Sequence, residues 1–172
     1  ILLLIFACVE GMFFSTSFAI IFYIRKHLPG LLKGLTYAND LINRDEGDHF
    51  EFAIELLTNV TPSELRPTFE TTRQIVQEAC EIEKAFAEEA LRGGGFPGLR
   101  TKDMQQYAEA VADYIMNALH QPPIYGVQNP LDYMDLVNMQ TKAGFMDCQA
   151  NDYQKLDLST EKDVWSDNDD DF

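Results

Sequence analysis

Basic residues are scarce in this sequence. Its 172 residues include 13 Lys and Arg against 28 Asp and Glu, which gives a formal net charge of −15 at pH 7. A surface with this excess of negative charge repels the phosphate backbone of a nucleic acid. The composition therefore argues against DNA or RNA as a partner.

Cysteine is also rare, and the three residues Cys8, Cys80 and Cys148 lie far apart without a CxxC pair. An odd number of widely spaced cysteines does not favour a disulfide framework. We expect reduced thiols in an intracellular, cytoplasmic protein. Buried packing is the expected role of Cys8 and Cys80.

No strand pattern and no internal repeat runs through the chain, whereas helical periodicity recurs. With 172 residues, 46% of them hydrophobic, the chain can form one ordinary domain with a sizeable core. We expect an all-α fold. The opening residues, ILLLIF, carry no initiating Met and no basic leader, and this start predicts the interior of a longer chain.

The apolar periodicity predicts four long helices. They cover residues 1–24, about 36–58, a stretch from the Thr61-Pro62-Ser63-Glu64 signal to the Gly93-Gly94-Gly95 run, and 101–119. A short helix is expected within 130–137. The connection at 28–35 is short enough to make the first two helices antiparallel neighbours.

The first of these stretches has two interpretations. Residues 1–24 are long and apolar enough for a membrane span, and a basic cluster follows at 25–27. However, Glu10 lies near the middle of the run, where a carboxylate in hydrocarbon is costly. The alternative is a central helix of a large bundle, in which a buried Glu10 needs a partner such as a metal ion.

Metal-ligand chemistry gathers in LINRDEGDHFEFA, residues 41–53. Glu46 and His49 are three residues apart, which places a carboxylate and an imidazole on one helix face. Ile42 and Asp45 fall on the same face. In di-metal carboxylate proteins, Glu-x-x-His pairs that point into the helical bundle contribute part of the metal ligand set. The spacing by itself also fits a solvated helix face.

After about residue 146 the composition changes to an acidic segment with few apolar residues, which is typical of a disordered tail. Solubilisation alone would explain the charge. The tail nevertheless carries three spaced aromatic residues, Tyr153, Trp165 and Phe172, which a purely solvating segment does not need.

Several blocks together resemble one known family. They are EGMFFSTSFAIIF, GLTYANDLINRDEGDHFEFA, EIEKAF, QYAEAVADY, NPLDYMD, TKAGF, NDYQ and the acidic tail that ends in Phe. In this order they are similar to the C-terminal half of the small, radical-generating subunit of class I ribonucleotide reductase, of the eukaryotic or large-virus type. The resemblance implies the C-terminal part of a ferritin-like helical bundle over residues 1–146. Residues 147–172 would be a flexible tail that docks on the large subunit.

The resemblance also implies roles for individual residues. Glu10, Glu46 and His49 match ligands of a di-iron centre, for which a manganese–iron pair is the alternative. Phe14, Phe18 and Ile42 match the apolar pocket around a stable tyrosyl radical, and Asp45 matches a carboxylate that supports the ligands. Tyr153 matches the tyrosine that relays the radical, and Trp165 and Phe172 belong to the docking segment. The implied partners are the large catalytic subunit and a second copy of the small subunit, with no membrane.

The matching half lacks part of the family's site. Three further ligands, an Asp, a Glu and a His, would come from a preceding half, together with the radical tyrosine and a relay tryptophan. Neither His27 nor His120 belongs to a second Glu-x-x-His pair, so we expect the chain alone to be inactive. Two other classes stay open: a different ferritin-like oxidase or desaturase, and a membrane-anchored helical protein.

Overall fold

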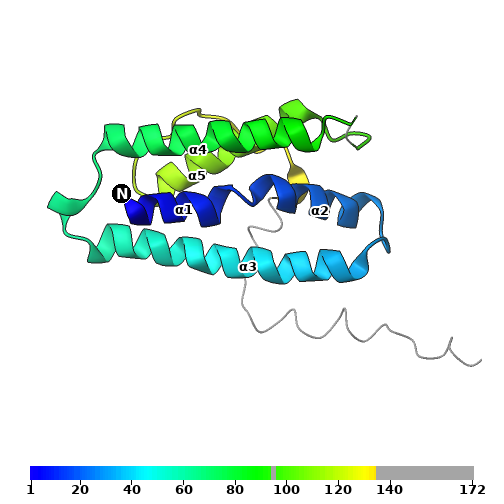
Figure 1. Cartoon of the computed structure of the whole chain (residues 1–172), viewed down its shortest axis with the longest axis horizontal. Coiled ribbons are helices and arrows are strands. Elements are labelled where there is room, and N and C mark those ends of the chain that lie inside the picture. Colours follow the sequence, from blue (N-terminus) through cyan, green and yellow to red (C-terminus); the bar gives the residue numbers. More distant parts are fainter. Residues whose placement is uncertain (94–95, 135–172) are drawn as a thin grey trace, which may run out of the picture.

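The computed structural model describes residues 1–93 and 96–134, which form helices joined by turns and loops (Figure 1). In chain order the elements are α1 (Leu2–Met12), α2 (Ser15–His27), α3 (Lys33–Glu55), a π-helical turn (Leu56–Val60), a 3₁₀ turn (Ser63–Leu65), α4 (Phe69–Ala90) and α5 (Thr101–Ala118). An isolated bridge between Phe96 and Leu99 is the one β-contact recorded for these ranges. The all-α expectation is confirmed for this part of the chain.

The helices form a layered bundle. α1 and α2 run one after the other, with α3 antiparallel beside them, and α4 and α5 pack together on the other side of α1 (Figure 1). One core joins α1, α3, α4 and α5 through small and medium side chains that include Ala7, Met12 and Ile115. A second core joins α2 to the ends of α4 and α5 through Phe22 and Met104. The short connection between α2 and α3 produces the expected antiparallel pair.

The expectation of one continuous helix over residues 1–24 is wrong. α1 ends at Met12, a turn at Phe13 and Phe14 interrupts the helix, and α2 begins at Ser15. A buried carboxylate from α4 stabilises this break. Glu83 is 2% exposed and accepts hydrogen bonds from the Thr16 amide at 2.8 Å and the Ser15 hydroxyl at 3.3 Å. It therefore satisfies a backbone donor at the start of α2, where no side chain of α2 itself serves as a cap.

The start of α4 also differs from the expectation. Thr61-Pro62-Ser63-Glu64 forms part of an irregular connection with one 3₁₀ turn, and α4 begins eight residues after Thr61, at Phe69. The Thr68 hydroxyl caps it by accepting from the Thr71 amide. On α5 the residues Met104, Tyr107, Ala108 and Ile115 are buried and form its inner side.

The apolar N-terminal segment packs against the rest of the bundle. By length and composition Leu2–His27 could cross a membrane, but 44% of its most apolar window is buried inside the fold. A core helix of a soluble protein passes the same test. In this structure the buried residues Leu4, Ala7 and Met12 contribute to the main core, so part of this apolar segment packs inside the fold.

The two described cysteines are buried and free, as expected. Burial raises the pKa of the Cys8 thiol to about 12 and that of Cys80 to about 11. Both stay protonated near neutral pH and behave as small hydrophobic side chains. Cys148 lies outside the described residues.

The Glu83 contact gives the first test. Glu83→Leu would leave the Thr16 amide and the Ser15 hydroxyl buried without an acceptor, so the free energy of unfolding should fall by about 1–3 kcal/mol for each unsatisfied group. Glu83→Gln keeps a side-chain oxygen and should cost less. Urea denaturation followed by circular dichroism measures both. Equal stability of the leucine variant and the parent would show that the carboxylate does not support the helix break.

Candidate metal centre

The site depends on a close crossing of α1 and α3. A β-carbon built on Gly11 would lie 2.6 Å from the Phe50 ring, a separation that no real side chain tolerates. Gly11 therefore lets the two helices approach at the turn that carries Glu10. The opposite stretch of α3 carries Glu46 and His49, one turn apart on one face.

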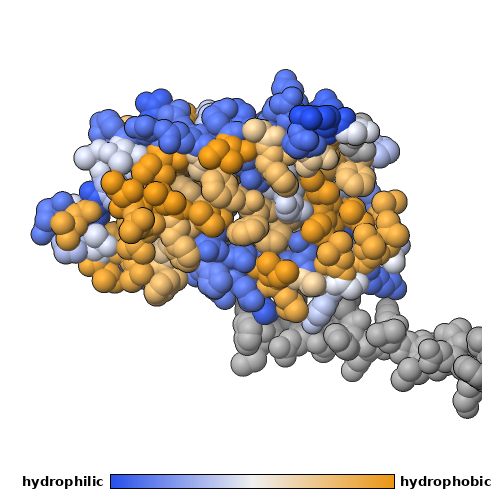
Figure 2. All heavy atoms as spheres, in the orientation of Figure 1, coloured by the Kyte–Doolittle hydropathy of each residue, from blue (hydrophilic) through white to orange (hydrophobic). Residues whose placement is uncertain are grey.

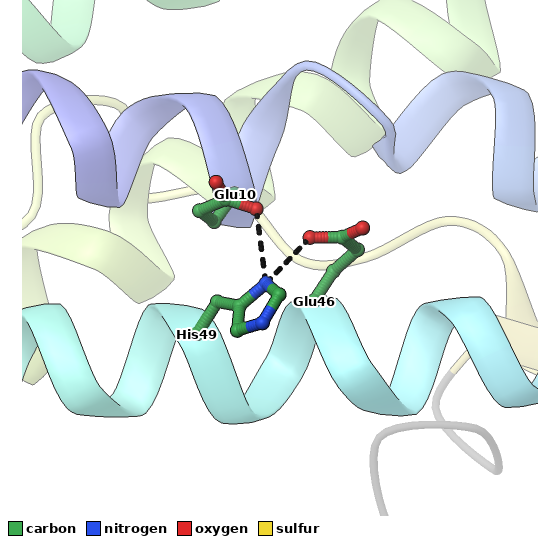
Figure 3. A group of neighbouring side chains, drawn as sticks. All are labelled: Glu10, Glu46 and His49. Atoms are coloured by element: carbon green, nitrogen blue, oxygen red, sulfur yellow. Dashed lines mark hydrogen bonds and ion pairs between the residues drawn. The ribbon is translucent and has the colours of Figure 1, made fainter.

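The three side chains converge between the two helices (Figure 3). The Nδ1 atom of His49 lies 3.1 Å from Oε2 of Glu46 and 3.5 Å from Oε2 of Glu10. One ligand atom from each residue lies within 4.8 Å of the other two. The convergence of these three residues, expected from the sequence, is thus present in the geometry. Whether they bind a metal is a separate question.

Burial differs across the group. The side chains of Glu10 and Glu46 are 14% and 19% exposed, whereas His49 is 56% exposed. The carboxylates also line a cleft of about 360 Å³ that reaches α5 through Tyr107 and Asp113. The two carboxylates are therefore half-buried between the helices, and the imidazole lies at the surface of the bundle.

The charges in the group perturb one another. A hydrogen bond with Glu46 raises the pKa of Glu10, and desolvation adds to this shift. The same hydrogen bond lowers the pKa of Glu46, with a further contribution from His49. The Glu46 carboxylate, followed by Glu10, raises the pKa of the His49 imidazole. The crowded carboxylates thus favour a proton on Glu10 and positive charge on His49.

This donor set fits a first-row divalent metal ion. Carboxylate oxygens and an imidazole nitrogen suit iron or manganese, and the crowding that favours a proton on Glu10 is the situation that a cation relieves. Three protein ligands leave coordination positions for other groups. The arrangement can therefore hold one side of a metal centre.

The remaining residues implied by the resemblance differ in position. Phe18 is buried and lines the cleft, and its ring lies 6.1 Å from that of Phe14. Phe14 itself is 39% exposed and Ile42 is 49% exposed. The Asp45 side chain is largely exposed, with its carboxylate 3.9 Å from Arg44. The structure brings Phe18 to the group, whereas the pocket role of Phe14 and Ile42 and the supporting role of Asp45 stay predictions.

The residues assigned to radical relay and docking, Tyr153, Trp165 and Phe172, lie outside the described residues, as does the boundary between 146 and 147. Their roles also stay predictions.

Two buried acids that position the bundle were not identified as such from the sequence. Glu83 accepts hydrogen bonds from the start of α2, directly after the turn that carries Glu10. Asp113 accepts four backbone hydrogen bonds from residues 124–127, two on each oxygen, and so fixes the loop after α5 against the cleft. For Glu83 the available signal was an acid on the same helix face as the apolar residues Val76, Ala79 and Cys80.

A glutamate on one helix and a Glu-x-x-His pair on its antiparallel neighbour are half of the ligand pattern of the helical di-metal carboxylate proteins. The fold and this group of residues define that class. Within it, the family model described as "Ribonucleotide reductase, small chain" matches residues 2–130. The chain belongs to the ribonucleotide reductase small-chain family.

Curated relatives agree with this assignment. The chain is 43% identical over 153 residues to a ribonucleoside-diphosphate reductase small chain of Arabidopsis thaliana, covering 89% of this chain and 44% of the relative. It is 39% identical over 161 residues to the small chain of Vaccinia virus (strain L-IVP), covering 94% of this chain and 49% of the relative. The chain thus spans just under half the length of these relatives.

A solved structure supports the fold. The Rnr4 homodimer from Saccharomyces cerevisiae matches with a TM-score of 0.68 and 29% sequence identity, covering 89% of this chain and 44% of that chain. The expected ferritin-like architecture of this family is confirmed, and the resemblance inferred from the sequence blocks is confirmed with it.

Glu46 provides a direct test of metal binding. Glu46→Gln removes one anionic ligand but keeps the shape of the side chain, so the affinity of the chain for Co²⁺ should fall by at least about tenfold. The control is Glu55→Gln, the same change on an exposed position of α3, and it should leave the affinity unchanged. Isothermal titration calorimetry measures both. Equal affinities for the two variants would contradict the ligand assignment.

Proposed function

We propose that this chain provides the C-terminal part of a ribonucleoside-diphosphate reductase small subunit and contributes three ligands to its di-metal centre. The observation that carries the proposal is the convergence of Glu10, Glu46 and His49 in a chain of the small-chain family. The chemistry that a bound iron pair, or a manganese–iron pair, supplies in such a centre is one-electron oxidation of a tyrosine side chain.

The residues of this chain would hold and insulate the centre. Glu10 and Glu46 would donate carboxylate oxygens from within the bundle, and His49 would donate Nδ1, the ring atom that faces both carboxylates. Phe18, buried along the same cleft, would keep water away from an oxidised side chain. Fixed ligands and a dry apolar wall are what the protein contributes to such chemistry.

The tail would connect this centre to the large catalytic subunit. Tyr153 lies in a segment with few apolar residues, so core packing does not explain it, and a phenol can be oxidised reversibly. Trp165 and Phe172 would act as aromatic anchors, which carry much of the energy of small interfaces. The acidic residues between them would speed association with a basic groove. Reduced thiols at Cys8 and Cys80 suit a cytoplasmic location.

The second candidate is a different oxidase or desaturase on the same fold. The Glu10, Glu46 and His49 group would serve it equally well, because the ligand pattern is common to the class. The tail separates the two candidates, since such an oxidase has no large subunit to dock on and no use for Tyr153.

Tyr153→Phe should therefore abolish nucleotide reduction in a complete small subunit that contains these residues, while the tyrosyl radical and binding to the large subunit persist. The matched control is Tyr37→Phe on α3, which should keep turnover. Electron paramagnetic resonance measures the radical, and product formation measures turnover. Turnover at the parent rate in the Tyr153 variant would favour the oxidase alternative.

Deletion of residues 165–172 should instead weaken binding to the large subunit. The radical should form normally, because no proposed ligand is removed, while affinity for the large subunit should drop by tenfold or more, roughly what the loss of one or two aromatic anchors costs. Surface plasmon resonance against the large subunit measures this loss. Trp165→Ala with Phe172→Ala should reproduce it, and undiminished binding by both proteins would remove the docking role.

A further inference from the structure

The chain doubles back after α5. Residues 121–134, which we call the strap, return beside α5 toward the end of α2 (Figure 1). Two contacts mark this course: Gln106 on α5 donates a hydrogen bond to the Gln128 carbonyl, and Lys26 on α2 pairs with Asp132. The strap contacts both cores through its apolar and aromatic side chains, which are Ile124, Tyr125, Leu131, Tyr133 and Met134. It is therefore packed into the bundle although residues 121–131 lie outside any helix.

One carboxylate holds the middle of the strap. Asp113 on α5 is 6% exposed and accepts four hydrogen bonds, at 2.7–3.2 Å, from the backbone amides of residues 124–127. Successive amides converge on one anion when the backbone curls into a concave nest. Gly126, with a φ of +66°, provides the left-handed residue that this curl requires. The strap thus has its shape because a side chain of α5 occupies the nest.

The segment held in this way is also a wall of the metal cleft. Val127, whose amide is the last of the four, and Asn129 line the cleft of about 360 Å³ together with Glu10 and Glu46. Phe18 lies along the same cleft. The position of this wall relative to the candidate ligands therefore depends on the contacts that fix the strap.

A direct chemical role for Asp113 does not fit its contacts. Each of its oxygens accepts two amide protons, which uses the lone pairs that a carboxylate offers. The side chain is therefore not free to bind a metal ion or to take a proton from a reacting group. Its effect on the cleft must pass through the strap.

The strap also leads to the tail, but chain length limits what its release would change there. Tyr153 follows the end of the strap by 19 residues and its start by 32. Because effective concentration falls roughly as the −3/2 power of tether length, freeing the whole strap would lower it only about twofold. The larger consequence of losing the anchor is expected at the cleft.

We propose that Asp113 is a positioning residue for the metal centre: it holds residues 124–127 in the nest, and the strap fixed in this way keeps small polar solutes out of the cleft. The inference rests on the proposed function, because it assigns to the cleft an oxidised centre that polar solutes would quench. It adds a residue that acts on this centre without touching it.

The test uses a complete small subunit that contains these residues. Asp113→Ala leaves the nest empty, so the amides of residues 124–127 should exchange with deuterium at least about tenfold faster, because charge-assisted hydrogen bonds are lost. Decay of the tyrosyl radical in ascorbate, followed by electron paramagnetic resonance, should accelerate by a similar factor, since the reductant enters when the strap opens. Binding to the large subunit should change by about twofold at most.

Formate separates the role of the carboxylate from a general loss of stability. It has the size of the group removed in Asp113→Ala, so added formate should slow both amide exchange and radical decay toward the parent rates. Asp113→Leu fills the same space with apolar atoms, and formate should not rescue it. Formate should leave the parent unchanged. Asp103→Ala, the same change at an acid of α5 that pairs with Arg100, should keep both parent rates.

Gly126→Ala tests the strap without altering Asp113 or a residue that lines the cleft. A β-carbon at this position would meet no atom within 4 Å, so the substitution acts through the strained positive φ alone. Because a single strained residue is tolerated better than an empty nest, this variant should fold, and it should also speed amide exchange and radical decay together.

The outcomes distinguish this inference from the proposed function. Fast amide exchange in Asp113→Ala and Gly126→Ala with radical decay at the parent rate would show a purely structural role and overturn the inference. Amides that stay protected without the carboxylate, or equal formate effects on the alanine and leucine variants, would also overturn it. A parent subunit that forms no radical would contradict the proposed function itself and remove the centre that the strap is proposed to protect.

Discussion

The close approach of α1 and α3 at Gly11 is the constraint on which the metal group depends. A β-carbon at this position would lie 2.6 Å from the Phe50 ring, so the ring or a helix would have to shift. Glu10 directly precedes Gly11 and meets His49 across this crossing. A residue without a side chain thus permits the packing beside the candidate ligands, although it offers no ligand atom itself.

The break between α1 and α2 is a second constraint on the same region. It follows Glu10 by three residues, and Glu83 supports it from a different helix. Glu83 lies on α4. The packing of α4 against α1 is therefore coupled to the course of the chain after the turn that carries Glu10. The buried carboxylate has two donors from residues 15 and 16, which offset part of its desolvation cost. A site that uses only three side chains therefore depends on four helices.

The sequence predicted the features that depend on local residue patterns, namely the positions of helices and the residues that share a helix face. Helical periodicity located α3, α4 and α5 to within a few residues except at the start of α4, and the Glu46–His49 spacing predicted their shared face. The break at Phe13 and Phe14 could not be predicted, because residues 1–24 show no Pro and their one Gly lies outside the turn. A contact with Glu83, 67 residues away along the chain, stabilises it. The exposure of Ile42 likewise depends on which helices cover α3, and periodicity carries no information about that.

Exposed apolar residues and the group of Glu10, Glu46 and His49 share one side of α1 and α3, where Figure 2 shows apolar surface on both sides of a hydrophilic centre. Leu2 and Phe6 precede Glu10 on α1, Leu35 and Ile42 precede His49 on α3, and all four apolar side chains are exposed. Burial of a carboxylate cluster without a counter-charge is costly, whereas burial of a neutralised cluster is much less so. Covering this surface and neutralising its carboxylates would therefore favour one another.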